Sequence, residues 1–339
     1  MNSVGVIGIG AVTPLGTGSE AIRMAVLGAG MPTPDFLAGP PGARPLPVLR
    51  VAPACEVRHP RLRRASPISH FAAAAALAAT AAIPGSRMAL IFAASDGAVI
   101  YSRRFFEEVI TSGSGSPLLF PETVYNAAAS HVAAMLGIDG CVLTMVGDAT
   151  AGTSALSTAL DVLAANEADQ CLVVAAQEVD WISVEGYRRW GLAAGGRRAA
   201  TTLAEGACAL LLGPAAPGDV VLNCVHPGLT ATPHARKETL RRLCQDLSRD
   251  GLPDLAILSA AAPSGDAAEN AAVLATFPSA RRIRPKSSLG EAFATSTLLQ
   301  VACGCLSIRE GLGRRAAITV PGLTGQTGGV LLTASAAGG

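Results

Sequence analysis

The sequence predicts an α/β protein, because short apolar runs typical of buried strands alternate along the chain with Ala-rich stretches typical of helices. A second observation is composition: half of the 339 residues are apolar and only 15% are charged, which is enough to bury a large core. Segments rich in Pro and Gly at 31–53 and 213–218 interrupt the pattern and are expected to be loops or a linker.

The alternation assigns each element in order. Strands are expected at Val4–Ile9, Met88–Phe92, Cys171–Ala175, Ala207–Leu212, Ala256–Leu258, Ala316–Val320 and Gly329–Thr333. Helices are expected at 67–82, 126–136, 152–166, 268–276 and 293–310. The loop at 213–218 divides the chain into 1–215 and 216–339, and each part ends in a pair of strand-like runs after a helix-rich stretch, which indicates an internal duplication.

Charge and hydropathy narrow the function class. The net charge is +1 and the pI is about 7.6, so no nucleic-acid footprint is expected and the partners are small molecules and proteins. Mean hydropathy is +0.41, yet the longest apolar stretch, Phe71 to Ile83, is shorter than the ~18 residues that span a bilayer. The first residues show no secretory signal, so we expect a cytoplasmic protein without a membrane segment.

The sequence signals for a metal site and for a dinucleotide site are both weak. The eight cysteines have scattered spacings in apolar segments, and Cys303-Gly-Cys305 is too close for a Cys-x-x-Cys knuckle, so core thiols and no metal site are expected. Gly8-Ile-Gly10 follows a strand, but Thr13-Pro14 stands where a dinucleotide fingerprint needs its third glycine. We therefore expect no cofactor.

The most informative segment is 142–156, where an apolar strand, a tight turn and a helix of small residues follow one another. Such a turn places residue 149 at a helix N-terminus, where the dipole lowers a thiol pKa or binds an anion. In this chain that residue is Ala149, whose side chain is a methyl group.

At this point the sequence resembles the β-ketoacyl synthase family. The resemblance rests on motifs that occur in the family's order over nearly the whole chain: Gly8–Gly16, Asp148–Leu156, Val173–Glu178, Ala204–Ala207, Lys286–Gly290 and Gly322–Thr327. It implies the thiolase fold, in which two similar α/β halves form a five-layered α-β-α-β-α body with a large dimer interface.

The resemblance assigns the family's catalytic cysteine to Ala149 and its second histidine to Glu291. The first histidine belongs in the segment 259–265, before Asp266, which contains no histidine. Decarboxylative condensation needs a thiolate and two imidazoles, so the resemblance implies a catalytically silent protein. Thr150 and Ser154 offer hydroxyls nearby but have no histidine close in sequence to activate them.

Other residues keep the family's pattern. Asp266, Glu269 and Lys286 retain the spacing of a polar network beside the site, and Lys286 is expected to pair with Glu269 or Glu291. His131 is expected to be structural and to lie near the interface. The remaining histidines, His59, His70, His226 and His234, are expected at the surface or in loops.

Within the family, the combination resembles the chain-length factors, inactive subunits that pair with an active ketosynthase. The segments 95–110 and 119–133 resemble their interface region, so Ala98, Tyr101, Phe105 and Phe120 are expected to line a shared acyl tunnel. The alternative is that Tyr101 and Phe105 only pack in a core.

The favoured function is a silent subunit that binds a ketosynthase and shapes the acyl tunnel in polyketide, polyene or fatty acyl biosynthesis. An acyl carrier protein is expected as a transient partner, docking mainly to the active subunit. Two alternatives stay open at this point. One is a ketosynthase-like decarboxylase or acyltransferase that uses Thr150, Glu291 or Lys286; the other is a homodimeric acyl-binding scaffold.

Overall fold

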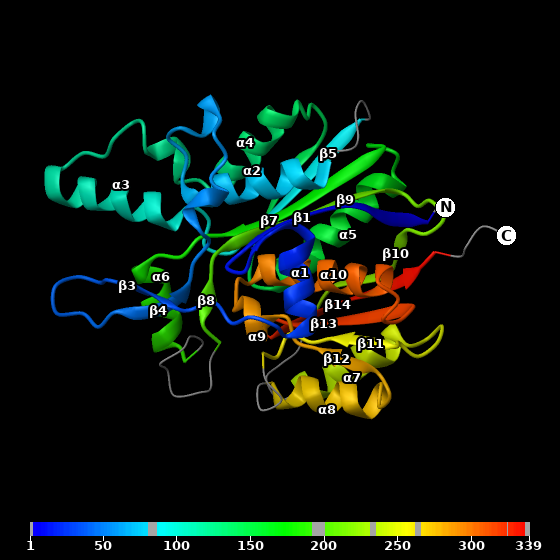
Figure 1. Cartoon of the computed structure of the whole chain (residues 1–339). Helices are drawn as coiled ribbons and strands as arrows, with labels where there is room; N and C mark the ends of the chain where they lie inside the picture. Colours follow the sequence, from blue (N-terminus) through cyan, green and yellow to red (C-terminus); the bar gives the residue numbers. More distant parts are fainter. Residues whose placement is uncertain are drawn as a thin grey trace.

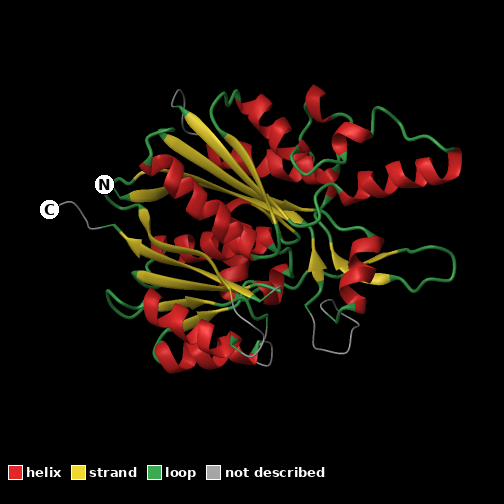
Figure 2. Cartoon of the chain, turned by 180° about the vertical axis from the view of Figure 1, so that it is seen from behind, coloured by secondary structure: helices red, strands yellow, loops and turns green. Residues whose placement is uncertain are grey.

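The computed structural model describes residues 3–80, 87–191, 201–230, 235–261, 266–323 and 325–335. Helices and sheet alternate in five layers, which confirms the predicted α-β-α-β-α arrangement (Figures 1 and 2). Within the described residues, no helix is long and apolar enough to cross a membrane.

The first half of the chain supplies one sheet layer and its covering helices. Its main strands are β1 (Val4–Thr13), β5 (Met88–Ala94), β6 (Val142–Val146), β7 (Gln170–Gln177) and β9 (Gly206–Pro214). Its helices are α1 (Gly18–Leu27), α2 (Pro67–Thr80), α3 (Val99–Ser112), α4 (Ala127–Leu136), α5 (Thr150–Ala164) and α6 (Trp181–Arg189). Short strands β2 (Gly16–Thr17), β3 (Asp35–Leu37), β4 (Leu46–Leu49) and β8 (Leu203–Ala204) and the 3-10 turns η1 (Pro53–Cys55), η2 (Pro60–Leu62) and η3 (Phe120–Glu122) complete it.

The second half repeats the plan with fewer additions. Its strands are β10 (Val220–Thr230), β11 (Leu255–Ile257), β12 (Arg281–Ile283), β13 (Arg315–Pro321) and β14 (Gln326–Ala334). Its helices are α7 (Arg236–Leu247), α8 (Ala267–Thr276), α9 (Lys286–Leu289) and α10 (Ala294–Arg309).

The two halves share one strand order. In the first half the strands lie β6-β5-β7-β9-β1, and in the second β12-β11-β13-β14-β10. Numbered along each half, both read third, second, fourth, fifth, first. The directions also agree, because the first three neighbours are parallel and the last two pairs are antiparallel. We propose the predicted division into 1–215 and 216–339 on this basis, since it falls in the turn between β9 and β10.

The start of α5, which carries Ala149, lies in the middle layer of the fold. Helices α5 and α10 fill the middle layer between the two sheet layers, whereas α2 and α4 cover one outer face and α7 and α8 the other (Figure 1). Nearly every residue of α10 is buried, which explains why its sequence lacks an amphipathic pattern. Gly152 brings α5 against α10, because a β-carbon there would lie 2.7 Å from Cβ of Thr297.

Each strand and helix predicted from the sequence is present, with small shifts at the ends. The prediction of a loop over 31–53 is partly wrong, because β3 and β4 pair there as an antiparallel hairpin and β4 also pairs in parallel with β8. The linker prediction at 213–218 also needs correction, since Gly213 and Pro214 still belong to β9. Strand β10 went unpredicted because Asn223, His226 and Pro227 interrupt its apolar run.

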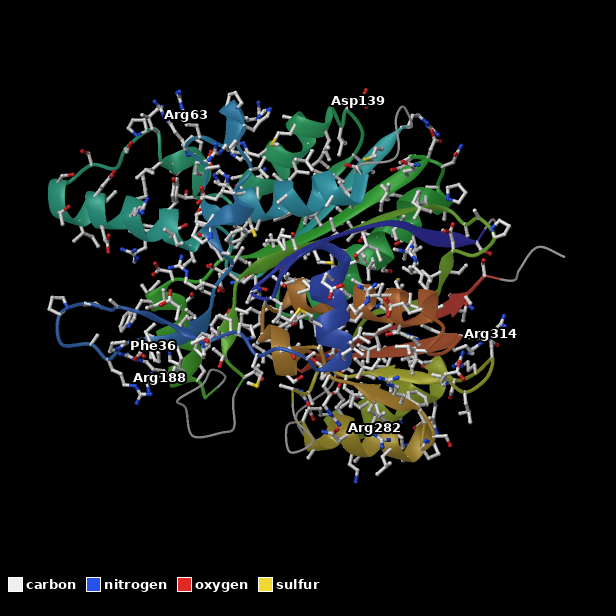
Figure 3. The ribbon with its side chains drawn as sticks, in the orientation of Figure 1. Phe36, Arg63, Asp139, Arg188, Arg282 and Arg314 are labelled. Carbon is white, nitrogen blue, oxygen red and sulfur yellow. The ribbon has the colours of Figure 1, made fainter. Side chains whose placement is uncertain are left out.

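Two elements project from the same side of the body: helix α3 and the arm formed by the β3–β4 hairpin (Figures 1 and 3). Helix α3 has no fully buried residue, so it contributes little to the core. Its N-terminal half is attached to the carboxylates that follow β7. Glu178 accepts a hydrogen bond from Ile100 N at 2.8 Å, and Asp180 binds Arg103 with both oxygens 3.0 Å from Nε.

Glu178 predicts a pH dependence of stability. Its carboxylate also accepts from Ser66 Oγ and Ile68 N, and burial raises its pKa to about 7. The folded chain then binds a proton more tightly than the unfolded chain, so stability present near pH 4.5 is lost as the pH rises through 7. For Glu178 alone the loss approaches ~3 kcal/mol.

Urea denaturation between pH 5 and 8 at constant ionic strength measures this slope, and Glu178→Gln is expected to make it shallower. The slope does not vanish, because burial also raises the pKa of Asp96, Glu205 and Glu269. Equal slopes in the variant and the parent chain would contradict the assignment to Glu178.

Candidate functional site

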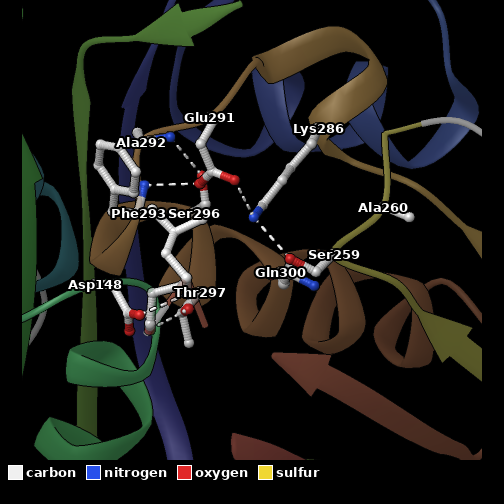
Figure 4. A network of polar contacts seen from close by, with 12 residues as sticks. Asp148, Ser259, Ala260, Lys286, Glu291, Ala292, Phe293, Ser296, Thr297 and Gln300 are labelled. Carbon is white, nitrogen blue, oxygen red and sulfur yellow. Dashed lines mark hydrogen bonds and ion pairs between the residues drawn. The ribbon is translucent and has the colours of Figure 1, made fainter. Parts of the chain in front are cut away.

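The turn before α5 places Ala149 where the sequence predicts it, at the N-terminal end of a helix in the middle of the body. The residue is buried, and its carbonyl accepts a hydrogen bond from Thr297 Oγ1 of α10 at 2.7 Å (Figure 4). The position therefore has the setting of an activated nucleophile, a helix N-terminus within a closed core, but no reactive atom.

Asp148 occupies the anion-binding end of this helix. Its Oδ1 accepts hydrogen bonds from Thr150 N at 3.0 Å and from Thr150 Oγ1 at 2.8 Å. A carboxylate in this position satisfies one of the backbone donors at the helix end that would otherwise stabilise an incoming anion. The chain thus fills its own site with a negative charge.

The glycine-rich loop between β13 and β14 closes over the same turn. Leu323 N donates to Asp148 Oδ2 at 2.6 Å, and Gln326 Oε1 lies 2.8 Å from Thr150 Oγ1. From the other side, Arg236 donates to the carbonyl of Gly322 at 3.0 Å. A β-carbon at Gly322 would lie 2.6 Å from the Asp148 carboxylate, so the close approach depends on glycine.

Glu291, which the resemblance assigns to the family's second histidine, is the partner of Lys286 (Figure 4). Lys286 is 4% exposed, and its Nζ lies 2.6 Å from Glu291 Oε2 and 2.7 Å from Ser259 Oγ. Glu291 Oε1 accepts from Phe293 N at 2.8 Å, which supports Phe293 in a backbone conformation with φ of 49°. Of the two partners expected for Lys286, the structure selects Glu291.

Glu269 and Asp266 serve different local roles. Glu269 is fully buried and accepts from Ser259 N, Ala260 N and Thr319 Oγ1 at 2.8, 2.7 and 2.5 Å, and its pKa is raised because burial disfavours the charge. Asp266 caps α8 through Ala268 N and Glu269 N and pairs with Arg236 at 2.5 Å. Ser259 links Glu269 to Lys286, because its backbone N–H donates to Glu269 and its hydroxyl accepts from Lys286.

The segment expected to carry the family's first histidine is only partly visible, because 262–265 lies outside the described residues. By sequence it has no histidine. Elsewhere, His131 bonds to Glu122 at 2.9 Å and His226 lies 3.4 Å from Cys224 Sγ. His234 also lies outside the described residues, so its predicted surface position remains a prediction.

Three of the buried cysteines are unsuited to act as a substitute nucleophile. Burial raises the pKa of Cys171, Cys244 and Cys305 to about 12, far from a thiolate at neutral pH. The described residues also contain no group of three His, Cys, Asp or Glu side chains placed to hold a metal ion. Thr150 is hydrogen-bonded to Asp148, but a carboxylate is a weak base for a hydroxyl.

A second buried polar group escaped the sequence analysis. Tyr187 of α6 donates to Asp96 Oδ1 at 2.7 Å, and Gln177 donates to Asp96 Oδ2 at 2.8 Å. Burial raises the Asp96 pKa. The Tyr187 ring also stacks on Phe293 at 4.7 Å between centroids, which connects this group to the Glu291 turn. No sequence motif links residues so far apart.

Residues 52–220, about half of the chain, match the family described as "Beta-ketoacyl synthase, N-terminal domain". The chain belongs to the β-ketoacyl synthase family. Comparison with curated proteins finds no match.

Solved structures of similar fold cover almost all of this ketosynthase-family chain. "The ishigamide ketosynthase/chain length factor" aligns with a TM-score of 0.84 and 19% identity over 98% of this chain and 99% of that one. A β-ketoacyl synthase from Burkholderia phymatum STM815 aligns at 0.82 with 17% identity, covering 98% and 100% of the two chains. The AntDE:AntF complex of a ketosynthase with its acyl-carrier protein aligns at 0.79 with 14% identity, covering 98% and 100%. These likenesses establish the thiolase fold.

The residues predicted to line a tunnel in this ketosynthase-like chain do not share one environment. Ala98 is the buried N-cap of α3 and does not belong to the helix proper. Phe105 packs on Phe120 of η3 at 5.6 Å between centroids, whereas Tyr101 carries Arg104 over its ring at 5.4 Å. Phe120 is 56% exposed. The tunnel role of the four residues remains a prediction.

Strand β6 forms the outer edge of the first sheet layer, so one side of it has no strand neighbour in the described chain. Its apolar side chains are exposed: Val142 by 39%, Leu143 by 38% and Val146 by 52%. Exposed apolar residues continue at Val124 and Tyr125, after η3. An unpaired apolar edge of this kind invites a second protein.

Proposed function

We propose that this chain is a catalytically silent, chain-length-factor-like subunit that pairs with an active ketosynthase and shapes its acyl tunnel. The observation that carries the proposal is the Ala149 site. The thiolase fold is intact, yet the nucleophile position holds a methyl group and its helix end is capped by Asp148. Glu291 forms an ion pair with Lys286.

The exposed edge of strand β6 supports the proposal that a ketosynthase is the partner. A chain of the same fold presents an equivalent edge, and two such edges can join through main-chain hydrogen bonds while Val142, Leu143 and Val146 are covered. The relative titled "ketosynthase/chain length factor" supports the same pairing. We therefore place the ketosynthase against β6, with α3 and η3 beside it.

A carrier protein is the proposed transient partner. The segment before α2 carries Arg58, Arg61, Arg63 and Arg64, all exposed, and no ion pair is found for them among the described residues. Arg63 lies at the edge of the body above α2 in Figure 3. Such a cluster attracts an acidic protein surface. The complex of a ketosynthase with its acyl-carrier protein among the similar structures supports this partner.

Co-expression with a ketosynthase tests the proposal. The expected product is a stable one-to-one complex, and Val146→Asp is expected to reduce the recovered ketosynthase roughly tenfold or more by placing a charge in the buried edge. Leu274→Asp on α8, where the leucine is 56% exposed, is the matched control and should leave the complex intact.

Two outcomes would overturn the proposed function. One is a homodimer that ignores the ketosynthase, which would favour the scaffold alternative. The other is release of carbon dioxide from malonyl-loaded carrier protein by this chain alone, which would favour the decarboxylase alternative. In the absence of both, an altered product length on co-expression with Phe105→Ala would extend the proposal to the tunnel.

A further inference from the structure

A groove of about 900 Å³ lies between helix α3, the arm of the β3–β4 hairpin and the start of α6. Its apolar walls come from all three elements: Leu37 of the arm, Val99, Phe106 and Ile110 of α3, and Trp181 and Ile182 of α6. The volume lies in the range of ligand sites, about 300–1,000 Å³. The groove is distant in sequence from Ala149 and uses none of the degenerate catalytic positions.

The apolar wall of α3 lacks cover. Phe106 is 62% exposed and Ile110 is 81% exposed, and both lie on the face of α3 that lines the groove. Across from them, Ile182 is 54% exposed. A helix that shows a row of apolar side chains to solvent is usually covered by a ligand or a partner.

The charges of the groove select the head group of its occupant. Arg103 is held by Asp180 at 3.0 Å and by Glu107 at 2.7 Å, so one guanidinium faces two carboxylates. The charged residues lining the groove therefore carry a net negative charge. An anionic ligand would meet these carboxylates at close range, whereas a neutral chain would not.

The arm forms a fixed wall. Gly39 lies flat on the Trp181 indole, since a β-carbon there would come within 2.3 Å of the ring, and Trp181 Nε1 donates to the carbonyl of Arg44 at 3.4 Å. The Arg103–Asp180 pair joins α3 to the α6 side of the groove. The groove is thus preformed by contacts at both of its sides.

From these features we propose that the groove binds an apolar chain with an uncharged head, an acyl group carried as a thioester or ester. The choice of an acyl chain rests on the proposed function, but binding in this groove needs only the isolated protein. The side chains that meet the acyl chain are Phe106, Ile110 and Trp181. Phe105 does not line this groove and packs against Phe120 and against the backbone of Gly115, so its predicted tunnel role is a separate question.

The two tryptophans make the test direct. Trp181 lines the groove, and the other, Trp190, is 75% exposed at the far end of α6. In a Trp190→Phe variant, fluorescence reports Trp181 alone, and a bromine atom quenches it only at contact. Titration with the N-acetylcysteamine thioester of 11-bromoundecanoic acid is expected to give saturable quenching. The free bromo-acid is expected to bind at least about tenfold more weakly.

Two variants in the Trp190→Phe background complete the design. Ile110→Glu puts a charge in the groove and is expected to abolish saturable quenching by the thioester. Leu274→Glu, at an exposed apolar position on α8 outside the groove, is the matched control and should leave the quenching unchanged. Far-UV circular dichroism of both variants checks that they remain folded.

Three results would overturn the inference: no saturable quenching by the thioester, equal quenching by thioester and acid, or unchanged binding in Ile110→Glu. The proposed function is tested separately by the complex with the ketosynthase. A chain that forms the complex but does not bind the thioester refutes only the proposal that the groove binds an acyl chain. If Trp181 then becomes buried on complex formation, the occupant of the groove is a segment of the partner. A chain that binds the thioester but forms no complex refutes only the proposed function.

Discussion

Replacing Glu291 with alanine is expected to lower the free energy of unfolding by about 3–5 kcal/mol. The variant leaves the Lys286 ammonium, 4% exposed, without the carboxylate that lies 2.6 Å away. A buried charge without a counter-charge costs several kcal/mol, and the neutral hydroxyl of Ser259 cannot replace the ion pair. Urea denaturation at pH 7 measures the change.

A double variant separates the charge from the packing. Lys286→Met with Glu291→Leu removes both charges and is expected to recover most of the lost stability, because apolar groups of similar size often replace a buried ion pair without loss. Glu291→His, which restores the family's residue, is expected to destabilise the chain as Glu291→Ala does, because it provides no anion for Lys286. Equal losses in the alanine and double variants would show that packing, and not the ion pair, dominates.

Placing a cysteine at 149 is expected to produce an unreactive thiol. The neighbouring Asp148 carboxylate already takes Thr150 N at the helix end, so the thiolate would meet a negative charge instead of free donors. Its pKa is expected to lie above the ordinary value of about 8.5. The pH dependence of iodoacetamide alkylation at residue 149, followed by mass spectrometry, measures this pKa.

The matched control adds Asp148→Asn, which keeps an acceptor for Thr150 N and removes the charge. The thiol pKa is then expected to fall by about one unit or more, which means roughly tenfold faster alkylation at pH 7. Neither variant is expected to condense acyl groups, because residue 291 still provides no imidazole. A thiol pKa below 8.5 with Asp148 in place would contradict this account of the site.

The fold was predictable in the parts that follow a simple period. Buried strands such as Met88–Ala94 and Ala-rich helices such as α2 can be predicted because most of their residues are apolar. Helix α7 was not predicted because most of its residues are polar, and strand β10 was not predicted because Asn223, His226 and Pro227 interrupt its apolar run. Their structure depends on the faces they pack against.

The site divides in the same way. The resemblance placed Ala149 and Glu291 by motifs in single segments; the structure puts Ala149 at the start of α5 and pairs Glu291 with Lys286. The closure by Leu323 and the Asp96–Tyr187 contact join residues from separate segments. Contacts of this kind have no local pattern to reveal them.

By itself, the sequence determined that the chain is an α/β protein with the ordered motifs of the ketosynthase type, because these are facts of residue identity and order. The resemblance then assigns Ala149 and Glu291 to the family's catalytic positions. Only the tertiary structure decided that Lys286 pairs with Glu291, that Phe105 turns away from the groove, and that Phe106 and Ile110 face it. The physical reason is that pairing and exposure depend on how distant segments are packed together. The empty position at 149 is written in the sequence, whereas its capping by Asp148 and covering by Leu323 arise only on folding.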